Sequence, residues 1–181
     1  DVFDIARSIK MRYQKIPIVV LTPFSHGITR RMENEDLSIF EYVFCWLGNT
    51  DLLVSIIKLI EDKMNLEHDI NVAGVQMILL VEDSIRFYSS ILPSLYKFVL
   101  QQSLEFATEA LNSHLETLRM RGRPKIVLAR NYEEAMELYE KYKRNVLGVV
   151  SDVRFERAGE IDATAGVKLA SYMRSNDRFL P

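Results

Sequence analysis

The chain is poor in the residues and segments that mark secreted and membrane proteins. Cys45 is the only cysteine among 181 residues, so no disulfide can form within the chain, which is typical of a reducing compartment. No apolar run approaches the roughly 18 residues that indicate a membrane-spanning helix. The first residues have neither a basic segment nor a long apolar core, so no signal peptide is predicted. We therefore expect a soluble cytoplasmic protein without a membrane partner.

Neither sign of charge dominates the sequence. The 23 lysines and arginines nearly balance the 25 aspartates and glutamates, so there is no electrostatic reason to expect nucleic acid as a partner. The glycine fingerprints of P-loops and dinucleotide-binding folds are absent, and the three histidines lack metal-ligand spacing. Because 48% of the residues are hydrophobic, the chain can nevertheless form a core of ordinary size.

Short apolar runs that alternate with helical patterns indicate an α/β fold. Five runs have the length and continuity of strands that are buried on both faces of a parallel sheet. They are Ile16–Leu21, Glu41–Trp46, Gln76–Val81, Lys125–Ala129 and Val146–Ser151. Alternating strands and helices predict a doubly wound parallel sheet.

Three helical segments are expected between these strands. Asp51–Met64 has an apolar stripe and either Thr50 or Asn49 as its N-cap, and the polar segment 65–74 after it is predicted to be a linker. Residues 132–143 follow an asparagine and carry a glutamate three positions after it, as in a capping box. Residues 85–123 are too long for an ordinary crossover, and Pro93 is expected in their first turns or at a kink.

Acidic residues follow two of the predicted strands. Glu82 and Asp83 come directly after the strand that contains Ile78–Val81, and Asp152 comes directly after Val146–Ser151. Because the carboxyl ends of parallel strands share one edge of the sheet, we expect the three carboxylates to meet there. Like charges this close raise one another's pKa unless a cation neutralises them. Carboxylate oxygens suit Mg²⁺, which usually works beside a phosphate, so we predict phosphate chemistry on a carboxylate.

The two ends of the sequence resemble each other. At one constant offset, Ile5 matches Leu169, Ala6 matches Ala170, Ile9 matches Met173, Lys10 matches Arg174, Ile16 matches Leu180 and Pro17 matches Pro181. We predict that both ends form a helix that leads into a strand. The alternative is that two unrelated amphipathic helices each precede a proline.

The acids and their strands resemble the receiver domains of response regulators of the CheY type. Receivers have an acidic pair after the first strand, here Glu82 and Asp83, and a phosphoacceptor aspartate after the third, here Asp152. Their five parallel strands have the order 2-1-3-4-5. The resemblance implies that Asp152 accepts a phosphoryl group and that Mg²⁺ is held by the three acids and the backbone carbonyl of Arg154.

The receiver elements occur in permuted order. The strand before Thr22 resembles the fourth strand of a receiver, with Thr22 as its switch hydroxyl, although a simple turn residue before a proline is as good an interpretation. Glu41–Trp46 resembles the fifth strand. This order predicts two receivers in tandem within a longer polypeptide, with residues 1–64 as the C-terminal half of the first and residues 75–181 as the N-terminal half of the second.

One complete set of five strands is present in these two halves. We therefore also predict a single composite receiver with the order 2-1-3-4-5, formed within one chain or by exchange between two chains. A long helical insertion would follow the Ile78–Val81 strand. The sequence departs from the family at Cys45 and Trp46, which stand where receivers have a lysine and a proline. Without the lysine, phosphoryl binding at a composite site is expected to be weak.

Three functions are compatible with these observations. The first is a phosphoacceptor that receives its phosphoryl group from a histidine kinase or phosphotransfer protein and regulates an attached domain. The second is a receiver-like scaffold that is not phosphorylated and uses the helical insertion either to form homodimers or to dock a downstream domain. The third is a regulatory segment of a phosphoenolpyruvate-synthase-like enzyme, because the whole sequence is similar to receiver regions found ahead of PEP/pyruvate-binding domains. In each case we expect no catalytic activity beyond self-phosphorylation.

Overall fold

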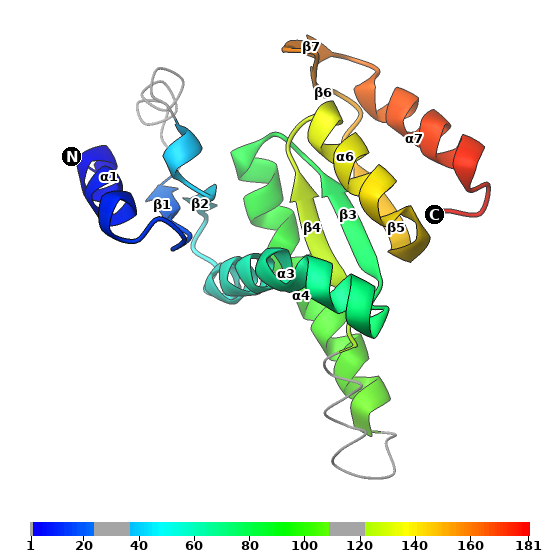
Figure 1. Ribbon diagram of the computed structural model, residues 1–181, viewed down its shortest axis with the longest axis horizontal. Coiled ribbons are helices and arrows are strands. Elements are labelled where there is room, and N and C mark those ends of the chain that lie inside the picture. Colours follow the sequence, from blue (N-terminus) through cyan, green and yellow to red (C-terminus); the bar gives the residue numbers. More distant parts are fainter. Residues whose placement is uncertain (1, 24–36, 109–121) are drawn as a thin grey trace.

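A three-stranded parallel sheet forms the centre of the computed structural model, which describes residues 2–23, 37–108 and 122–181 (Figure 1). β3 (Met77–Val81) lies between β4 (Lys125–Ala129) and β5 (Val146–Ser151). β3 and β4 are almost wholly buried, whereas β5 is partly exposed. The predicted α/β class and these three strands are confirmed, because apolar runs without alternation are typical of strands covered on both faces.

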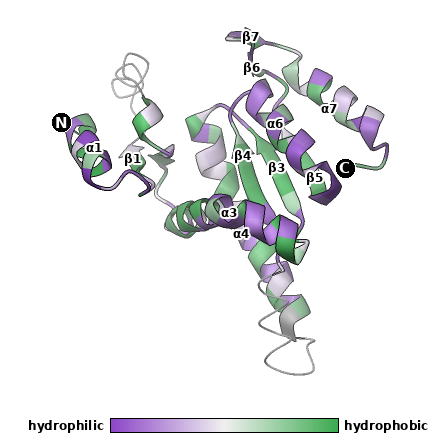
Figure 2. Cartoon of the chain, in the orientation of Figure 1, coloured by the Kyte–Doolittle hydropathy of each residue, from purple (hydrophilic) through white to green (hydrophobic). Residues whose placement is uncertain are grey.

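Helices cover both faces of this sheet. Alternate residues of β3 and β4 point to opposite faces, so each face has its own apolar core. One core packs under α6 (Tyr132–Tyr142) and α7 (Ala165–Asn176) and includes Met77, Leu79, Val81, Tyr139, Leu169 and Met173. The other packs under α3 (Asp51–Ala73) and α4 (Ile85–Thr108) and includes Leu59, Leu80, Leu92, Tyr96, Ile126 and Leu128. Figure 2 shows the apolar strands between helices of mixed character.

The prediction of one five-stranded sheet is wrong. β1 (Val19–Pro23) and β2 (Tyr42–Trp46) pair with each other in a separate parallel sheet. In the order 2-1-3-4-5, β1 would lie beside β5. Pro181 lies beside β5 instead. The backbone N–H of Val149 donates to the Pro181 carbonyl at 3.1 Å.

β1 does not lie beside β5 because the C-terminal end of the chain, which resembles the N-terminal end in sequence, already lies there. The repeat predicted a helix at each end, and both α1 (Val2–Arg12) and α7 are present. Leu169 of α7 is fully buried in the core, whereas the matching Ile5 of α1 is exposed. α7 and Pro181 thus already fill the position that α1 and β1 would need beside β5.

The outer edge of β2 is covered by α4 rather than by a strand. The Tyr88 hydroxyl donates to the carbonyl of Val43, and the backbone N–H of Cys45 donates to Ser89 Oγ at 2.9 Å. These side chains satisfy backbone groups that a neighbouring strand would otherwise pair with. The β1-β2 sheet is therefore held against the rest of the molecule by helix contacts.

α3 is longer than predicted. The segment 65–74, which was expected to be a linker, is helical as far as Ala73. Leu66 and Ile70 continue the buried stripe of the helix, so its last turns gain core contacts. Gly74 ends the helix in the left-handed conformation (φ 65°), and its N–H donates to the Ile70 carbonyl.

The helix starts follow the predicted capping residues. Asn49 accepts the N–H of the first α3 residue at 2.9 Å, whereas Thr50 makes no side-chain cap bond. Asn131 caps α6 by accepting the N–H of Glu134 at 2.8 Å, as predicted. In α4, Pro93 lies inside the helix, and the remaining part of the expected insertion, 109–121, lies outside the described residues.

A buried charge network ties α3 to α4 and β4. Asp62 of α3 is fully buried and accepts two bonds from the Arg123 guanidinium, at 2.6 and 3.0 Å. It also accepts the Tyr96 hydroxyl at 2.9 Å and the backbone N–H of Ile126 at 3.0 Å. Four donors on one carboxylate offset the cost of burying its charge.

Candidate metal centre

The predicted acids lie at the carboxyl ends of two neighbouring strands. Glu82 and Asp83 follow β3, and the N–H of Glu82 donates to the Ala129 carbonyl of β4 at 3.0 Å. Asp152 follows β5, and its N–H donates to the Val81 carbonyl at 3.0 Å. The hydrogen-bond ladder therefore extends one residue beyond each strand and fixes the backbone of both acidic segments.

The three carboxylates converge into one cluster, which we call the acidic triad. One oxygen from each of Glu82, Asp83 and Asp152 can be chosen so that all three lie within 4.8 Å of one another. Glu82 is buried, Asp83 is half-buried and Asp152 is exposed. Ligand oxygens about 2.1 Å from Mg²⁺ lie about 3 Å apart when adjacent in its octahedron, so the three oxygens would move closer together on binding one ion.

The electrostatics of the acidic triad favour a cation. Burial, followed by the charges of Asp152 and Asp83, raises the pKa of Glu82, although the N–H of Ser84 partly opposes this shift. Burial, followed by the charges of Asp152 and Glu156, likewise raises the pKa of Asp83. A divalent cation would relieve both the mutual repulsion and the loss of hydration.

The backbone of Asp152 is held by the start of α7. The N–H of Gly166 donates to the Val153 carbonyl at 3.0 Å. A Cβ at position 166 would lie 2.1 Å from the Asp152 carbonyl oxygen and 2.9 Å from Val153 Cα. Only glycine fits this close approach, so Gly166 positions Asp152. No local sequence pattern reveals this contact.

The long loop after Asp152 contains a small antiparallel hairpin. β6 (Phe155–Arg157) pairs with β7 (Glu160–Asp162), and the side chain of Phe155 is buried in the core beside α6 and α7. The N–H of Ala158, at the hairpin tip, donates to Glu133 at the start of α6 at 3.0 Å. The hairpin is therefore anchored next to the acidic triad and does not project freely into solvent.

The other residues expected at the site lie elsewhere or remain untested as ligands. Thr22 is the penultimate residue of β1, and β1 and β5 belong to different sheets at opposite sides of Figure 1, so one chain does not bring Thr22 to the acidic triad. Cys45 is buried in β2, where burial raises the pKa of its thiol, so the thiol is neutral and supplies no positive charge. Arg154 is exposed in the turn after Asp152, and its carbonyl stays a predicted ligand.

The acidic triad can bind a divalent cation and leave one carboxylate free to react. Two acids with limited exposure and one exposed acid can hold a divalent cation, while the exposed Asp152 keeps an oxygen accessible to a phosphorus centre.

No protein-family model, curated protein or solved structure matches the chain, so its function has to be argued from this site. Within the described residues, no helix is both long enough and apolar enough to cross a membrane.

Proposed function

We propose that this chain is a phosphoacceptor receiver region of a two-component signalling protein. Asp152 takes a phosphoryl group from a phosphohistidine on a histidine kinase or phosphotransfer protein, and its modification regulates an attached domain. The observation that carries this proposal is the exposed Asp152 beside Glu82 and Asp83, with oxygens of all three within 4.8 Å. Glu82, Asp83, Asp152 and the carbonyl of Arg154 would hold Mg²⁺.

The proposed reaction is a displacement at phosphorus. One carboxylate oxygen of Asp152 forms the new O–P bond as the P–N bond of the phosphohistidine breaks, and the imidazole leaves with the electron pair. Bound Mg²⁺ would neutralise charge on the phosphoryl oxygens. Gly166 and the β3 backbone hold Asp152 in place, which keeps its reacting oxygen at the carboxyl edge of the sheet.

The strand order supports the same proposal. The order β4-β3-β5 is the order that the first three strands of a receiver have, 2-1-3, and β1 and β2 are parallel neighbours, as the fourth and fifth strands are. We interpret residues 1–64 and 75–181 as halves of two receivers. Residues 65–73 then join these halves through the continuous helix α3.

Intact mass spectrometry after incubation with Mg²⁺ and acetyl phosphate tests this proposal. We expect a gain of one phosphoryl group that is lost in Asp152→Asn. Asp51→Asn is the matched control, because Asp51 is an exposed carboxylate at the start of α3, and this variant should be labelled like the natural chain. Labelling that persists in Asp152→Asn would exclude Asp152 as the phosphoacceptor. The absence of labelling in folded natural protein would exclude it as well.

A second function is favoured by one specific observation. Cys45, at the position of the receiver lysine, is buried and uncharged, so nothing in β2 contributes a cation to phosphoryl binding. A receiver-like scaffold needs no such cation. It would use the exposed aromatic residues Phe87, Phe98 and Phe106 of α4 for homodimers, or serve as a regulatory segment of a phosphoenolpyruvate-synthase-like enzyme. Absence of labelling with intact Mg²⁺ binding would favour this scaffold.

A further inference from the structure

One carboxylate holds the start of α7. Asp162, the last residue of β7, accepts the backbone N–H of Thr164 at 2.9 Å and the Thr164 hydroxyl at 2.8 Å, both on one oxygen. Its other oxygen accepts the Lys168 ammonium at 2.6 Å. The Lys168 bond, followed by the two bonds from Thr164, holds the pKa of Asp162 well below its usual range. Asp162 therefore ties the end of the hairpin to the first two turns of α7, where a negative charge is also favourable beside the helix N-terminus.

The hairpin that carries Asp162 is itself fixed to α6. The Arg157 guanidinium lies 4.9 Å from the centre of the Tyr132 ring and 3.5 Å from Asp162. Ala158 at the hairpin tip has a φ of 55°, a left-handed conformation that is strained for any residue except glycine. It is kept in this conformation while its N–H donates to Glu133 of α6. The hairpin is thus a firm support for the carboxylate that holds α7.

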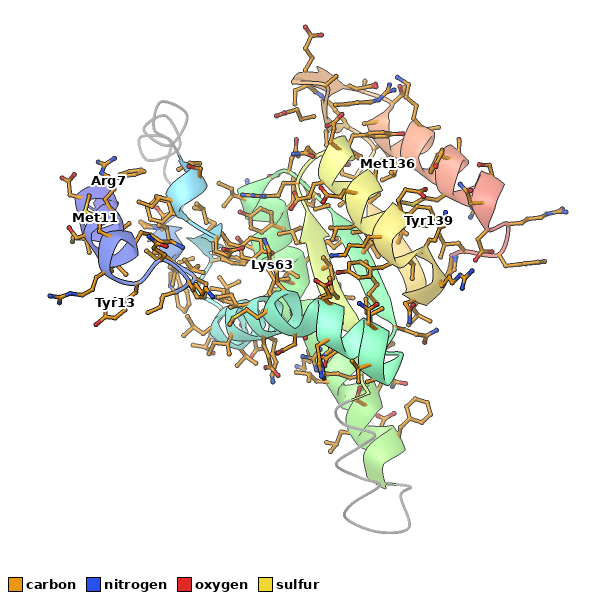
Figure 3. The ribbon with its side chains drawn as sticks, in the orientation of Figure 1. Arg7, Met11, Tyr13, Lys63, Met136 and Tyr139 are labelled. Carbon is orange, nitrogen blue, oxygen red and sulfur yellow. The ribbon has the colours of Figure 1, made fainter. Side chains whose placement is uncertain are left out.

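The rest of α7 is held separately. Tyr139, which is labelled in Figure 3, lies between α6 and α7. Its hydroxyl donates to the Met173 carbonyl at 3.3 Å, and its ring packs edge-on against Tyr172. Leu169 and Met173 are also buried in the core under these helices. We therefore expect that loss of the Asp162 bonds loosens only the first turn of α7 and leaves the remaining helix in place.

The acidic triad depends on this first turn. Asp162 binds the residues two positions before and two positions after Gly166. Gly166 donates its N–H to the carbonyl of Val153 at 3.0 Å, and a Cβ on it would lie 2.1 Å from the Asp152 carbonyl oxygen. Because the two backbones are in such close contact, a shift of the first turn of α7 is transmitted to the backbone of Asp152.

We propose that Asp162 is a positioning residue that sets the affinity of the acidic triad for Mg²⁺. It acts through Gly166, which it holds against Asp152, so that the Asp152 carboxylate stays beside Glu82 and Asp83. The inference rests on the Mg²⁺ site of the proposed function and is independent of phosphoryl transfer. Loss of a group that orients metal ligands weakens metal binding about 10- to 100-fold, and the lower end applies here because Asp162 acts through α7.

Calorimetric titration of Mg²⁺ into the full chain, with no phosphoryl donor present, tests the proposal. Asp162→Ala removes all three bonds to α7 and should weaken Mg²⁺ binding about tenfold. Glu160→Ala is the matched control, because Glu160 is an exposed acid on the same strand and its loss removes the same charge. The control should bind Mg²⁺ nearly as tightly as the natural chain. Asp162→Asn, which keeps an oxygen for Thr164, should restore part of the lost affinity.

Lys168→Met separates positioning from simple charge effects. The variant removes a positive charge from α7, so by charge alone it would strengthen the binding of a cation. Loss of the bond to Asp162 should instead weaken Mg²⁺ binding, in the same direction as Asp162→Ala. The Lys168 side chain is 47% exposed, so this variant is expected to fold and decides the question even if Asp162→Ala does not fold.

Hydrogen exchange gives a local readout that a general loss of stability would not produce. In Asp162→Ala the amide of Gly166 should exchange faster, because its bond to Val153 is loosened. The amide of Gly74, which donates to Ile70 at the end of α3, should keep its natural rate.

The possible failures are distinguishable. If Asp162→Ala bound Mg²⁺ as tightly as Glu160→Ala, or Lys168→Met bound it more tightly than the natural chain, the positioning role would be overturned and the proposed function would stand. If the natural chain bound no Mg²⁺ at millimolar concentrations, both would be overturned. The expected affinities without any labelling of Asp152 by acetyl phosphate would support the role of Asp162 and exclude the phosphoacceptor function.

Discussion

Asp62→Asn is expected to destabilise the fold strongly although it changes almost no volume. Asp62 is 0% exposed, and its partner Arg123 is 5% exposed, so the substitution leaves a buried guanidinium without its counter-charge. Desolvation lowers the pKa of Arg123, but in the natural chain Asp62 outweighs it and holds this pKa above its ordinary value. Without Asp62 the guanidinium still keeps its charge, because arginine is not deprotonated in proteins. Removing one partner of a buried ion pair costs about 3–5 kcal/mol.

Equilibrium unfolding in urea, followed by circular dichroism at pH 7, measures this loss. Glu61→Gln is the matched control one residue away on α3, because Glu61 pairs with Lys58 at 2.7 Å with 44% of its side chain exposed. An exposed pair of this kind contributes at most about 1 kcal/mol. If Asp62→Asn lost no more stability than Glu61→Gln, the buried network would not hold α3 against α4 and β4.

Two further predictions concern the acidic triad. Burial, with the charges of Asp152 and Asp83, raises the pKa of Glu82 in the folded state, so the folded chain binds more protons than the unfolded chain and loses stability as pH rises through that pKa. Glu82→Gln should therefore raise the melting temperature at pH 7 without Mg²⁺. It should also abolish the further rise in melting temperature that Mg²⁺ causes in the natural chain. If Mg²⁺ raised the melting temperature of the variant and of the natural chain equally, Glu82 would not be a ligand. Gly166→Ala forces the Asp152 backbone to move and should weaken Mg²⁺ binding about tenfold in calorimetric titrations, as the loss of groups that orient metal ligands does. Gly148→Ala is its control, because a Cβ there makes only ordinary contacts, and equal affinities would contradict the positioning role of Gly166.

Local patterns predicted the elements of this fold well. The runs at β3, β4 and β5 had the length and apolar continuity of buried strands, and the structure has strands there. Asn131 was recognisable as an N-cap because capping depends only on residues three positions apart. The convergence of the acidic triad was also predictable, since acids at the ends of adjacent parallel strands must share one edge of the sheet.

Pairing between distant segments was decided only in three dimensions. Ile16-Pro17 and Leu180-Pro181 are locally alike, so the sequence could not say which would lie beside β5, and the structure places Pro181 there. Segment 65–73 is polar enough for a linker, yet its buried Leu66 extends α3 because a core surface is available.

The sequence by itself thus determined the strands, the helix starts and the acids that end β3 and β5, because each depends on neighbours along the chain. Only the tertiary structure decided the separate β1-β2 sheet, the burial of Asp62 and the contact of Gly166 with Asp152. Each of these features depends on which segments pack against one another, and that depends on the packing of the whole molecule and not on local sequence preference.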